Sequence, residues 1–168
     1  FHAHAALRDP LWSRGLGDVY KRQVYQRYCG LLEQIDCDYF YRICADSPFL
    51  PINLITLYNK LIESNPGIDI ISNVIRRTFP KGFSLELVKK TAFISKNFQK
   101  SNDFSYEHVT GSFYGVEAGY SSISLETCHE FRKNYAIDTL EDYNQLKEGK
   151  GIERLNQTDL RIINSYDS

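Results

Sequence analysis

The spacing of apolar residues changes along the chain, and these changes predict an alternation of helices and strands. Residues 24–35 carry apolar side chains at helical spacing, which predicts an amphipathic helix. Residues 39–44, YFYRIC, form an aromatic and β-branched run that is typical of a strand. A second helix is expected from Pro51, because proline is tolerated in a first turn, and Asn65-Pro66-Gly67 ends it.

The second half of the chain continues this alternation. Residues 68–74 are almost continuously apolar, as in a strand that is buried on both faces. Thr139 is expected to cap the last helix, with Asp142 as its capping-box partner. The remaining expected elements are strands at 83–88, 121–125 and 135–137 and helices at 89–98, 104–114 and 139–147.

Strands that alternate with helices predict an α/β fold with a mostly parallel sheet covered on both faces. Such sheets bind ligands at the carboxyl ends of their strands. Asp46 follows one expected strand and Asp138 follows another, so both carboxylates would lie on one rim. A hard cation held by few protein ligands and several waters fits Mg²⁺. The alternative is that Asp46 only forms a turn before Pro48 and that Asp138 only precedes a helix cap.

The two ends of the chain read differently from the middle. Residues 1–23 have no sustained period, and residues 9–23 resemble a translated sequencing adapter, so we expect them to lie outside the fold. A floppy natural N-terminus is the alternative. The polar stretch 149–168 is expected to be a C-terminal extension. This leaves residues 24–148 as the predicted domain.

Composition and charge exclude several classes of protein. The 168 residues have a formal net charge of -1, which provides no strong field for nucleic acid or anionic lipid. The sequence shows no bilayer-spanning apolar run and no secretory signal. The four cysteines form no C-x-x-C pair, which is typical of reduced thiols. We therefore expect a cytoplasmic protein without nucleic-acid or membrane partners.

One short motif favours a different enzyme class. Asp36-Cys37-Asp38 is a D-x-D triplet, which holds a metal in some glycosyltransferases. There it would follow a hydrophobic strand, whereas here it precedes one. We interpret the triplet as a turn, and a metal-dependent glycosyltransferase remains an alternative function.

Four blocks of sequence together resemble one enzyme family. RICADSPFL at 42–50 resembles the R-x-x-x-D-x-P-L motif of cytidylyltransferases of the spore-coat-polysaccharide type. SN at 72–73 with RTFPKGFSLE at 77–86 is similar to the second family block, and YEHVT at 106–110 and DTLED at 138–142 resemble the third and fourth. The blocks occur in the family's order between residues 24 and 147. One such match is weak, but four in order are fairly specific.

The resemblance implies a nucleotide-diphospho-sugar transferase fold, a Rossmann-like three-layer α/β sandwich. It implies transfer of CMP from CTP to a sugar or sugar acid, with release of pyrophosphate, in surface-polysaccharide biosynthesis. It also implies Mg²⁺ and, since relatives are often dimers, a homodimer. By the same resemblance, Asp46 and Asp138 would hold the metal, and Arg42 would contact the nucleotide phosphates. The acceptor pocket would be lined by Arg77, Glu86, Glu107 and His108.

Several of these residues have a second interpretation. His108 is a candidate general base because imidazole titrates near neutral pH, but a hydrogen-bonded helix residue is the alternative. Glu86 could be a solvent-facing strand residue, and Arg77 a solvated loop charge.

The sequence departs from the family at its beginning. The family opens with a strand and a loop of glycine and arginine that cradles the triphosphate and ends in lysine. SRGLG at 13–17 followed by Lys21 resembles this loop faintly, but no strand precedes it. We therefore predict that the first strands of the sheet are missing, and that this chain alone is an inactive fragment of such an enzyme.

Overall fold

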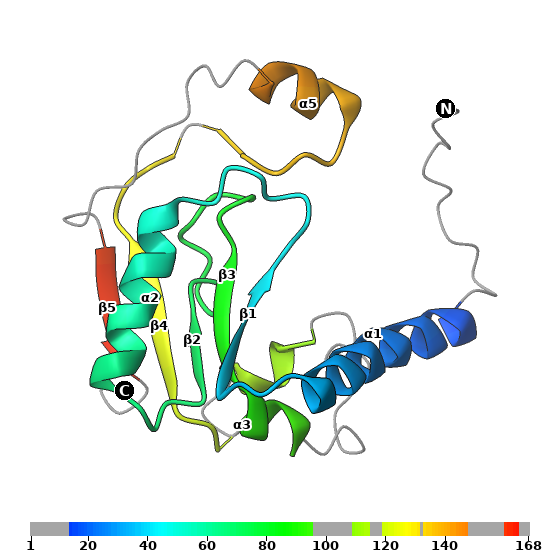
Figure 1. Ribbon diagram of the computed structural model, residues 1–168. Coiled ribbons are helices and arrows are strands. Elements are labelled where there is room, and N and C mark those ends of the chain that lie inside the picture. The colour runs from blue at the N-terminus through cyan, green and yellow to red at the C-terminus, as the bar shows by residue number, and fades with distance from the viewer. Residues whose placement is uncertain (1–13, 96–108, 115–118, 132, 148–159, 165–168) are drawn as a thin grey trace. The chain divides into compact units, whose positions relative to one another are not determined.

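The computed structural model describes residues 14–95, 109–114, 119–131, 133–147 and 160–164. For residues 14–23 it describes the backbone alone. The elements, in chain order, are α1 (Arg14–Gln34), β1 (Tyr39–Ile43), α2 (Ile52–Ser64), β2 (Ile70–Ser72), β3 (Leu85–Lys89), α3 (Lys90–Ile94), the 3₁₀ turn η3 (Gly111–Phe113), β4 (Ser122–Thr127), α5 (Leu140–Leu146) and β5 (Leu160–Asn164) (Figure 1).

The chain divides into two compact units. Helix α1 belongs to one of them. All the described strands, together with α2, α3 and α5, belong to the other, which we call the sheet unit. The fold and site described below are those of the sheet unit.

The sheet unit is built on a mixed sheet with the strand order β1-β3-β2-β4-β5 (Figure 1). Among the described strands, β2 and β4 pair in parallel and the other three pairs are antiparallel. The prediction of a mostly parallel sheet is therefore wrong. The reason is that β3 returns between β1 and β2 after a loop, and an antiparallel neighbour needs no crossover helix.

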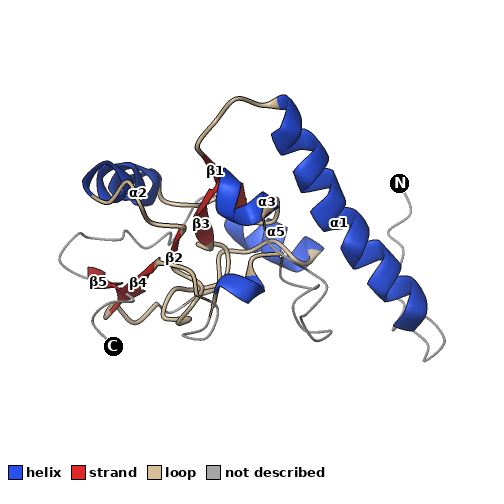
Figure 2. Cartoon of the chain, turned by 90° about the horizontal axis from the view of Figure 1, so that it is seen from below, coloured by secondary structure: helices blue, strands red, loops and turns tan. Residues whose placement is uncertain are grey.

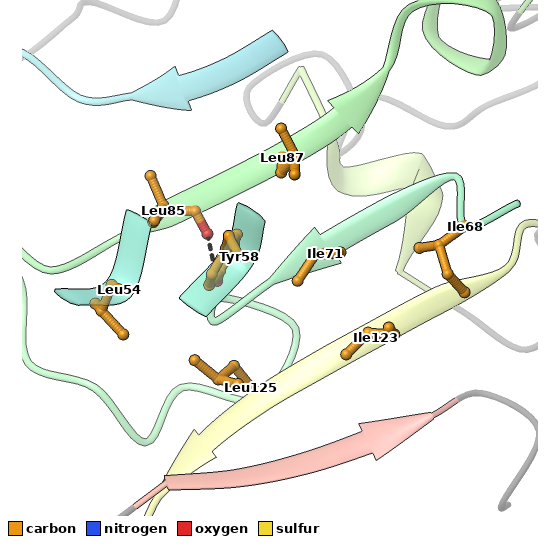
Figure 3. Packing of buried hydrophobic residues seen from close by; sticks show 8 residues of the cluster. All are labelled: Leu54, Tyr58, Ile68, Ile71, Leu85, Leu87, Ile123 and Leu125. Atoms are coloured by element: carbon orange, nitrogen blue, oxygen red, sulfur yellow. Dashed lines mark hydrogen bonds between the residues drawn. The ribbon is translucent and has the colours of Figure 1, made fainter. Parts of the chain in front are cut away.

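The core lies between α2 and one face of the sheet. The apolar stripe of α2 packs against apolar side chains on one face of the sheet, where every second residue of a strand points. The buried cluster consists of Leu54, Tyr58, Ile68, Ile71, Leu85, Leu87, Ile123 and Leu125 (Figure 3). Tyr58 is fully buried, and its hydroxyl donates to the Leu85 carbonyl at 3.0 Å. Burial raises the pKa of Tyr58 well above its ordinary value.

Helices lie on both faces of the sheet. Figure 2 shows α2 on one side of the strands. On the opposite side, Phe93 of α3 packs edge-on against Phe40 of β1, with ring centroids 5.2 Å apart. The Rossmann-like three-layer arrangement stays a prediction.

Most expected elements are present, and some boundaries differ. β1, α2 and β4 are confirmed, and β2 and β3 form shorter or shifted strands than expected. The helix expected from residue 24 begins at Arg14. The strand expected at 135–137 is wrong, because the N–H groups of Tyr135 and Ile137 donate to loop carbonyls instead. In the polar C-terminal stretch, residues 160–164 form β5, which the sequence does not predict.

Helix α5 begins with the predicted capping box. The Asp142 N–H donates to Thr139 Oγ1 at 3.1 Å, and the Thr139 N–H donates back to Asp142 Oδ2 at 2.8 Å. The side-chain hydrogen bond from Thr139 is the main cause that lowers the pKa of Asp142 below its ordinary value. The box therefore fixes the start of the helix directly after Asp138.

Gly82 allows two loops of the sheet unit to touch. Its φ of 91° lies in a region that favours glycine, and a Cβ there would meet the Tyr135 carbonyl carbon at 2.3 Å. Beside it, the Tyr135 N–H donates to the Lys81 carbonyl at 2.8 Å. The absence of a side chain at Gly82 is what permits this contact.

Candidate functional site

Three strands of the sheet end on a common edge. β1, β2 and β4 run in the same direction, since β1 and β2 both pair antiparallel with β3 and β4 is parallel to β2. The loops that follow them, residues 44–51, 73–84 and 128–138, are joined by hydrogen bonds to one another. We call this the carboxyl edge. It is the place where α/β sheets generally bind ligands.

Asp46 and Asp138 lie on two loops of the carboxyl edge that are bonded to each other. The Ile137 N–H donates to the Asp46 carbonyl oxygen at 2.9 Å. One predicted metal ligand, Asp46, therefore makes this backbone bond itself, and the other, Asp138, is the residue that follows Ile137. Both side chains are exposed, and Asp46 Oδ1 accepts from the Ser47 hydroxyl at 3.1 Å.

These two carboxylates have a donor set that suits a hard cation. The described residues contain no group of three or more His, Cys, Asp or Glu side chains that could hold a metal ion. Two exposed carboxylates with water completing the shell is nevertheless how proteins usually hold Mg²⁺. The metal role of Asp46 and Asp138 stays a prediction.

A polar row crosses the sheet on the face opposite α2. Strand pairing places Arg42 opposite Glu86, Glu86 opposite Ser72, and Ser72 opposite Ser124. Directly paired residues point to the same face, so the four side chains form one line across β1, β3, β2 and β4. The interpretation of Glu86 as a solvent-facing strand residue is wrong, because its exposed fraction is 0 %.

Glu86 is the centre of the polar row. Arg42 Nη1 lies 2.6 Å from Glu86 Oε2, and the side chain of Arg42 is 19 % exposed. The other carboxylate oxygen, Oε1, accepts from the Tyr114 hydroxyl, and from Ser72 Oγ at 3.4 Å. Hydrogen bonds of this kind offset the hydration that a carboxylate loses when it is buried.

Arg42 is thus held by a protein carboxylate as well as being a predicted phosphate ligand. Burial alone would lower the pKa of Arg42, but the charge of Glu86 and its hydrogen bond outweigh burial and raise it. Arginine has five N–H donors in a fixed fork, so an ion pair with Glu86 leaves donors that could contact a second anion. Sequence reasoning assigned Arg42 and Glu86 to different ligands and missed that they form a pair.

The SN pair of the second block has a structural role here. Asn73 is buried, its Nδ2 donates to the Phe83 carbonyl at 2.7 Å, and its Oδ1 accepts from the Leu85 N–H at 2.8 Å. The Asn73 side chain therefore continues the β2–β3 pairing beyond the end of β2. Ser72 Oγ accepts from the Val74 N–H at 3.0 Å, which fixes the start of the same loop.

The other residues singled out in the sequence lie away from the polar row or outside the described residues. Arg77 is exposed in the loop that follows β2. Glu107 and His108 lie outside the described residues, so their roles stay predictions. Asp38 of the D-x-D triplet lies just before the amino end of β1, where its carbonyl accepts from the Lys90 N–H. This is the edge opposite Asp46, so the position does not favour the glycosyltransferase alternative.

A pocket of about 570 Å³ opens at the carboxyl end of β4. One wall comes from the loop after β2 and the other from the end of β4 and the segment that follows it. Its lining residues are Thr78, Phe79, Pro80, Thr127, Cys128, His129, Glu130, Phe131, Lys133 and Asn134. The sequence analysis gave these residues no role, although Thr78, Phe79 and Pro80 lie in the second motif block. The rule that selected Asp46 would also have selected the charged and aromatic residues that directly follow β4.

Comparison with known proteins identifies the fold. The chain is similar to the solved structure of a cytidylyltransferase from Leptospira borgpetersenii serovar Hardjo-bovis (strain JB197), with a TM-score of 0.64 and 23 % sequence identity. The similarity covers 74 % of this chain and 53 % of that protein. No protein-family model and no curated protein sequence matches the chain. The likeness shows a shared mixed α/β fold, and this chain spans about half the length of that structure.

No helix within the described part of the chain is long and apolar enough to cross a membrane.

Proposed function

We propose that the protein is a cytidylyltransferase of the spore-coat-polysaccharide type, which transfers CMP from CTP to a sugar or sugar acid and releases pyrophosphate. The observation that carries this proposal is that Asp46 and Asp138 lie on two loops of the carboxyl edge, which the Ile137 N–H and the Asp46 carbonyl join. It occurs in a fold shared with a cytidylyltransferase. The four motif blocks at 42–50, 72–86, 106–110 and 138–142 support the same assignment.

The chemistry requires an acceptor oxygen to attack the α-phosphorus of CTP while pyrophosphate leaves. Negative charge is spread over phosphate oxygens, so positioning and cations supply most of the catalysis. Asp46 and Asp138 would hold Mg²⁺, which when bound neutralises this charge. Arg42, oriented by Glu86, would donate charge-assisted hydrogen bonds to the nucleotide phosphates.

The acceptor would bind beside the nucleotide. Arg77, Glu86, Glu107 and His108 are the residues proposed to line that side of the site, with His108 as candidate general base. In the described structure Glu86 already bonds Arg42 and Tyr114, so its contribution to acceptor binding would pass through these two side chains. We further propose a cytoplasmic homodimer that acts in surface-polysaccharide biosynthesis.

Calorimetric titration of CTP into the chain, with and without MgCl₂, tests the nucleotide site. We expect binding that EDTA abolishes and that Asp46→Ala or Asp138→Ala weakens by about tenfold or more, equivalent to about 1.4 kcal/mol. Asp36→Ala is the matched control, because this exposed carboxylate comes before β1 and should leave binding unchanged. Binding that Asp46→Ala and Asp138→Ala both leave intact would remove the metal assignment.

Turnover tests the reaction itself. The chain is incubated with CTP, MgCl₂ and a panel of sugars and sugar acids, and pyrophosphate and the CMP-linked product are followed by ³¹P NMR and mass spectrometry. If the chain has the proposed activity, the two products should form in equal amounts with at least one acceptor. A folded chain that neither binds CTP nor releases pyrophosphate with any acceptor would support the inactive-fragment alternative.

A further inference from the structure

The pocket at the end of β4, which we call the β4 pocket, has a fixed framework. The Thr127 N–H donates to Thr78 Oγ1 at 2.9 Å, which ties the two walls together. The His129 N–H donates to Thr127 Oγ1 at 3.1 Å, which fixes the chain as it leaves β4. These bonds hold the backbone on both sides of the pocket before any ligand enters.

Two lining residues of the pocket, Phe131 and His129, belong to a cluster of aromatic rings. Phe131 packs edge-on against Phe83, with ring centroids 5.5 Å apart, and Phe83 stacks on Tyr135 at 4.7 Å. Phe83 and Tyr135 are both 0 % exposed, so this part of the cluster belongs to the core. The ring of His129 in turn meets Phe131 edge-on at 4.5 Å. Phe131 and His129 are thus positioned by packing.

The chemistry of the lining favours a hydroxylated anion. Lys133 and His129 supply two groups that can donate to an anion, whereas Glu130 is the single carboxylate among the lining residues. Thr78, Thr127 and Asn134 add hydroxyl and amide groups, and Phe79 and Phe131 add flat apolar surfaces. The volume of about 570 Å³ suits a small molecule. A purely apolar ligand would desolvate these polar groups without bonding them.

The pocket belongs to the same edge as the paired carboxylates. Residues 128–138 run from the pocket wall to Asp138, and within this segment Tyr135 is bonded to Lys81 and Ile137 to Asp46. A ligand in the pocket and an ion on Asp46 and Asp138 would therefore both contact the loops of the carboxyl edge.

We propose that the β4 pocket binds the acceptor of the transfer reaction through an anionic group, carboxylate or phosphate. Lys133 and His129 bind the anion, and Phe131 supports the sugar ring. The inference rests on the proposed function for the identity of the ligand as acceptor. The site itself consists of residues that the motif blocks do not assign, apart from Thr78, Phe79 and Pro80.

The test measures binding by the full chain without CTP or Mg²⁺. Glucuronate, glucose 6-phosphate and glucose are titrated separately into ¹⁵N-labelled protein, and amide shifts are followed by NMR. We expect at least one of the two anionic sugars to shift the amides of residues 127–134 and to bind about tenfold more tightly than glucose, which one charge-assisted contact can supply. Glucuronate alone indicates a carboxylate ligand, and glucose 6-phosphate alone indicates a phosphate ligand.

Two variants assign the anion contact. Lys133→Ala and His129→Gln should each weaken binding of the anionic sugar by about tenfold while leaving glucose unchanged. Lys60→Ala is the matched control, an exposed lysine on α2 that should have no effect. The proposal is overturned if a folded chain binds neither anionic sugar, if glucose binds equally well, or if both variants bind as the wild type does.

The outcome separates this proposal from the proposed function. Anionic-sugar binding at 127–134 in a chain that fails to transfer CMP would retain the β4 pocket and remove the transferase. CMP transfer that Lys133→Ala and His129→Gln leave unchanged, with no shifts at 127–134, would retain the transferase and remove the pocket as its acceptor site.

Discussion

The two faces of the sheet are made by the same strands but are held together by different forces. The face toward α2 is a continuous apolar cluster that includes Leu54, Ile71 and Leu85 (Figure 3). The opposite face carries a polar row centred on the buried ion pair of Arg42 and Glu86. Neighbouring residues of one strand therefore contribute stability by apolar burial on one side and by charge pairing on the other.

This difference between the two faces indicates where the fold tolerates substitutions. Apolar packing responds in proportion to the volume removed, since no single contact is indispensable. A buried charge pair responds to the loss of one partner far more than to the loss of both. The polar row is also the face that carries the residues proposed to contact ligands, so stability and function are coupled there more than on the α2 face.

The largest effect is expected from breaking the ion pair on one side. Arg42→Met leaves the carboxylate of Glu86 buried without its cation, and we expect the free energy of unfolding to fall by about 3–5 kcal/mol in urea titrations. The double variant Arg42→Met/Glu86→Leu should recover most of the loss. Equal losses in the single and double variants would show that the pair itself is unimportant.

A second ion pair, whose arginine is mostly exposed, provides the comparison for this prediction. Arg76 Nη1 lies 3.5 Å from Glu126 Oε1, and the Arg76 side chain is 68 % exposed. Arg76→Met removes the same type of charge from a side chain that is mostly in solvent, opposite a Glu126 side chain that is 14 % exposed, and should cost less than Arg42→Met. A loss as large as that of Arg42→Met would mean that burial does not distinguish the two pairs.

The next effect in size comes from the apolar face. Leu54 of α2 is 0 % exposed, and Leu54→Ala should lower the free energy of unfolding by about 3 kcal/mol through lost burial and the cavity left behind. Ile52→Ala, two residues earlier and 80 % exposed, should change it by less than about 0.5 kcal/mol. Similar losses in the two variants, measured by urea unfolding, would contradict the packing of α2 on the sheet.

The smallest effect is expected at the end of the polar row. Ser124 Oγ is buried and has no hydrogen-bond partner among the described residues. Ser124→Ala should therefore leave stability unchanged or raise it by up to about 1 kcal/mol, because it removes an unpaired polar group. Ser72→Ala is the contrast, since its hydroxyl bonds Glu86 and the Val74 N–H and its loss should cost about 1 kcal/mol. A clear loss in Ser124→Ala would show that this hydroxyl has a partner of its own.

Local sequence signals predicted the elements whose cause is local. The stripe of α2, the breakers after it and the capping box of Thr139 and Asp142 depend on residues within a few positions, and all three are present. Strand direction was predicted wrongly, because an apolar run has the same pattern in parallel and antiparallel neighbours. β5 was missed because its partner β4 lies far away along the chain.

The candidate site was predicted in the same uneven way. Placing Asp46 and Asp138 at one edge needed only the rule about strand ends. The pairing of Arg42 with Glu86 depends on the register between β1 and β3, and the contact of Tyr114 with Glu86 depends on a return of the chain. Neither contact can be predicted from the spacing of residues within one segment. The β4 pocket was missed since its walls are loops, whose side-chain directions follow no period.

Gly82 has a consequence for how this protein can vary. With a φ of 91° and the Tyr135 carbonyl carbon 2.3 Å from where a Cβ would stand, every other side chain must displace backbone. In a library that samples all amino acids across residues 77–86, selection for folded protein should retain only glycine at position 82. Arg77, which is exposed in the same loop, should tolerate many replacements under the same selection.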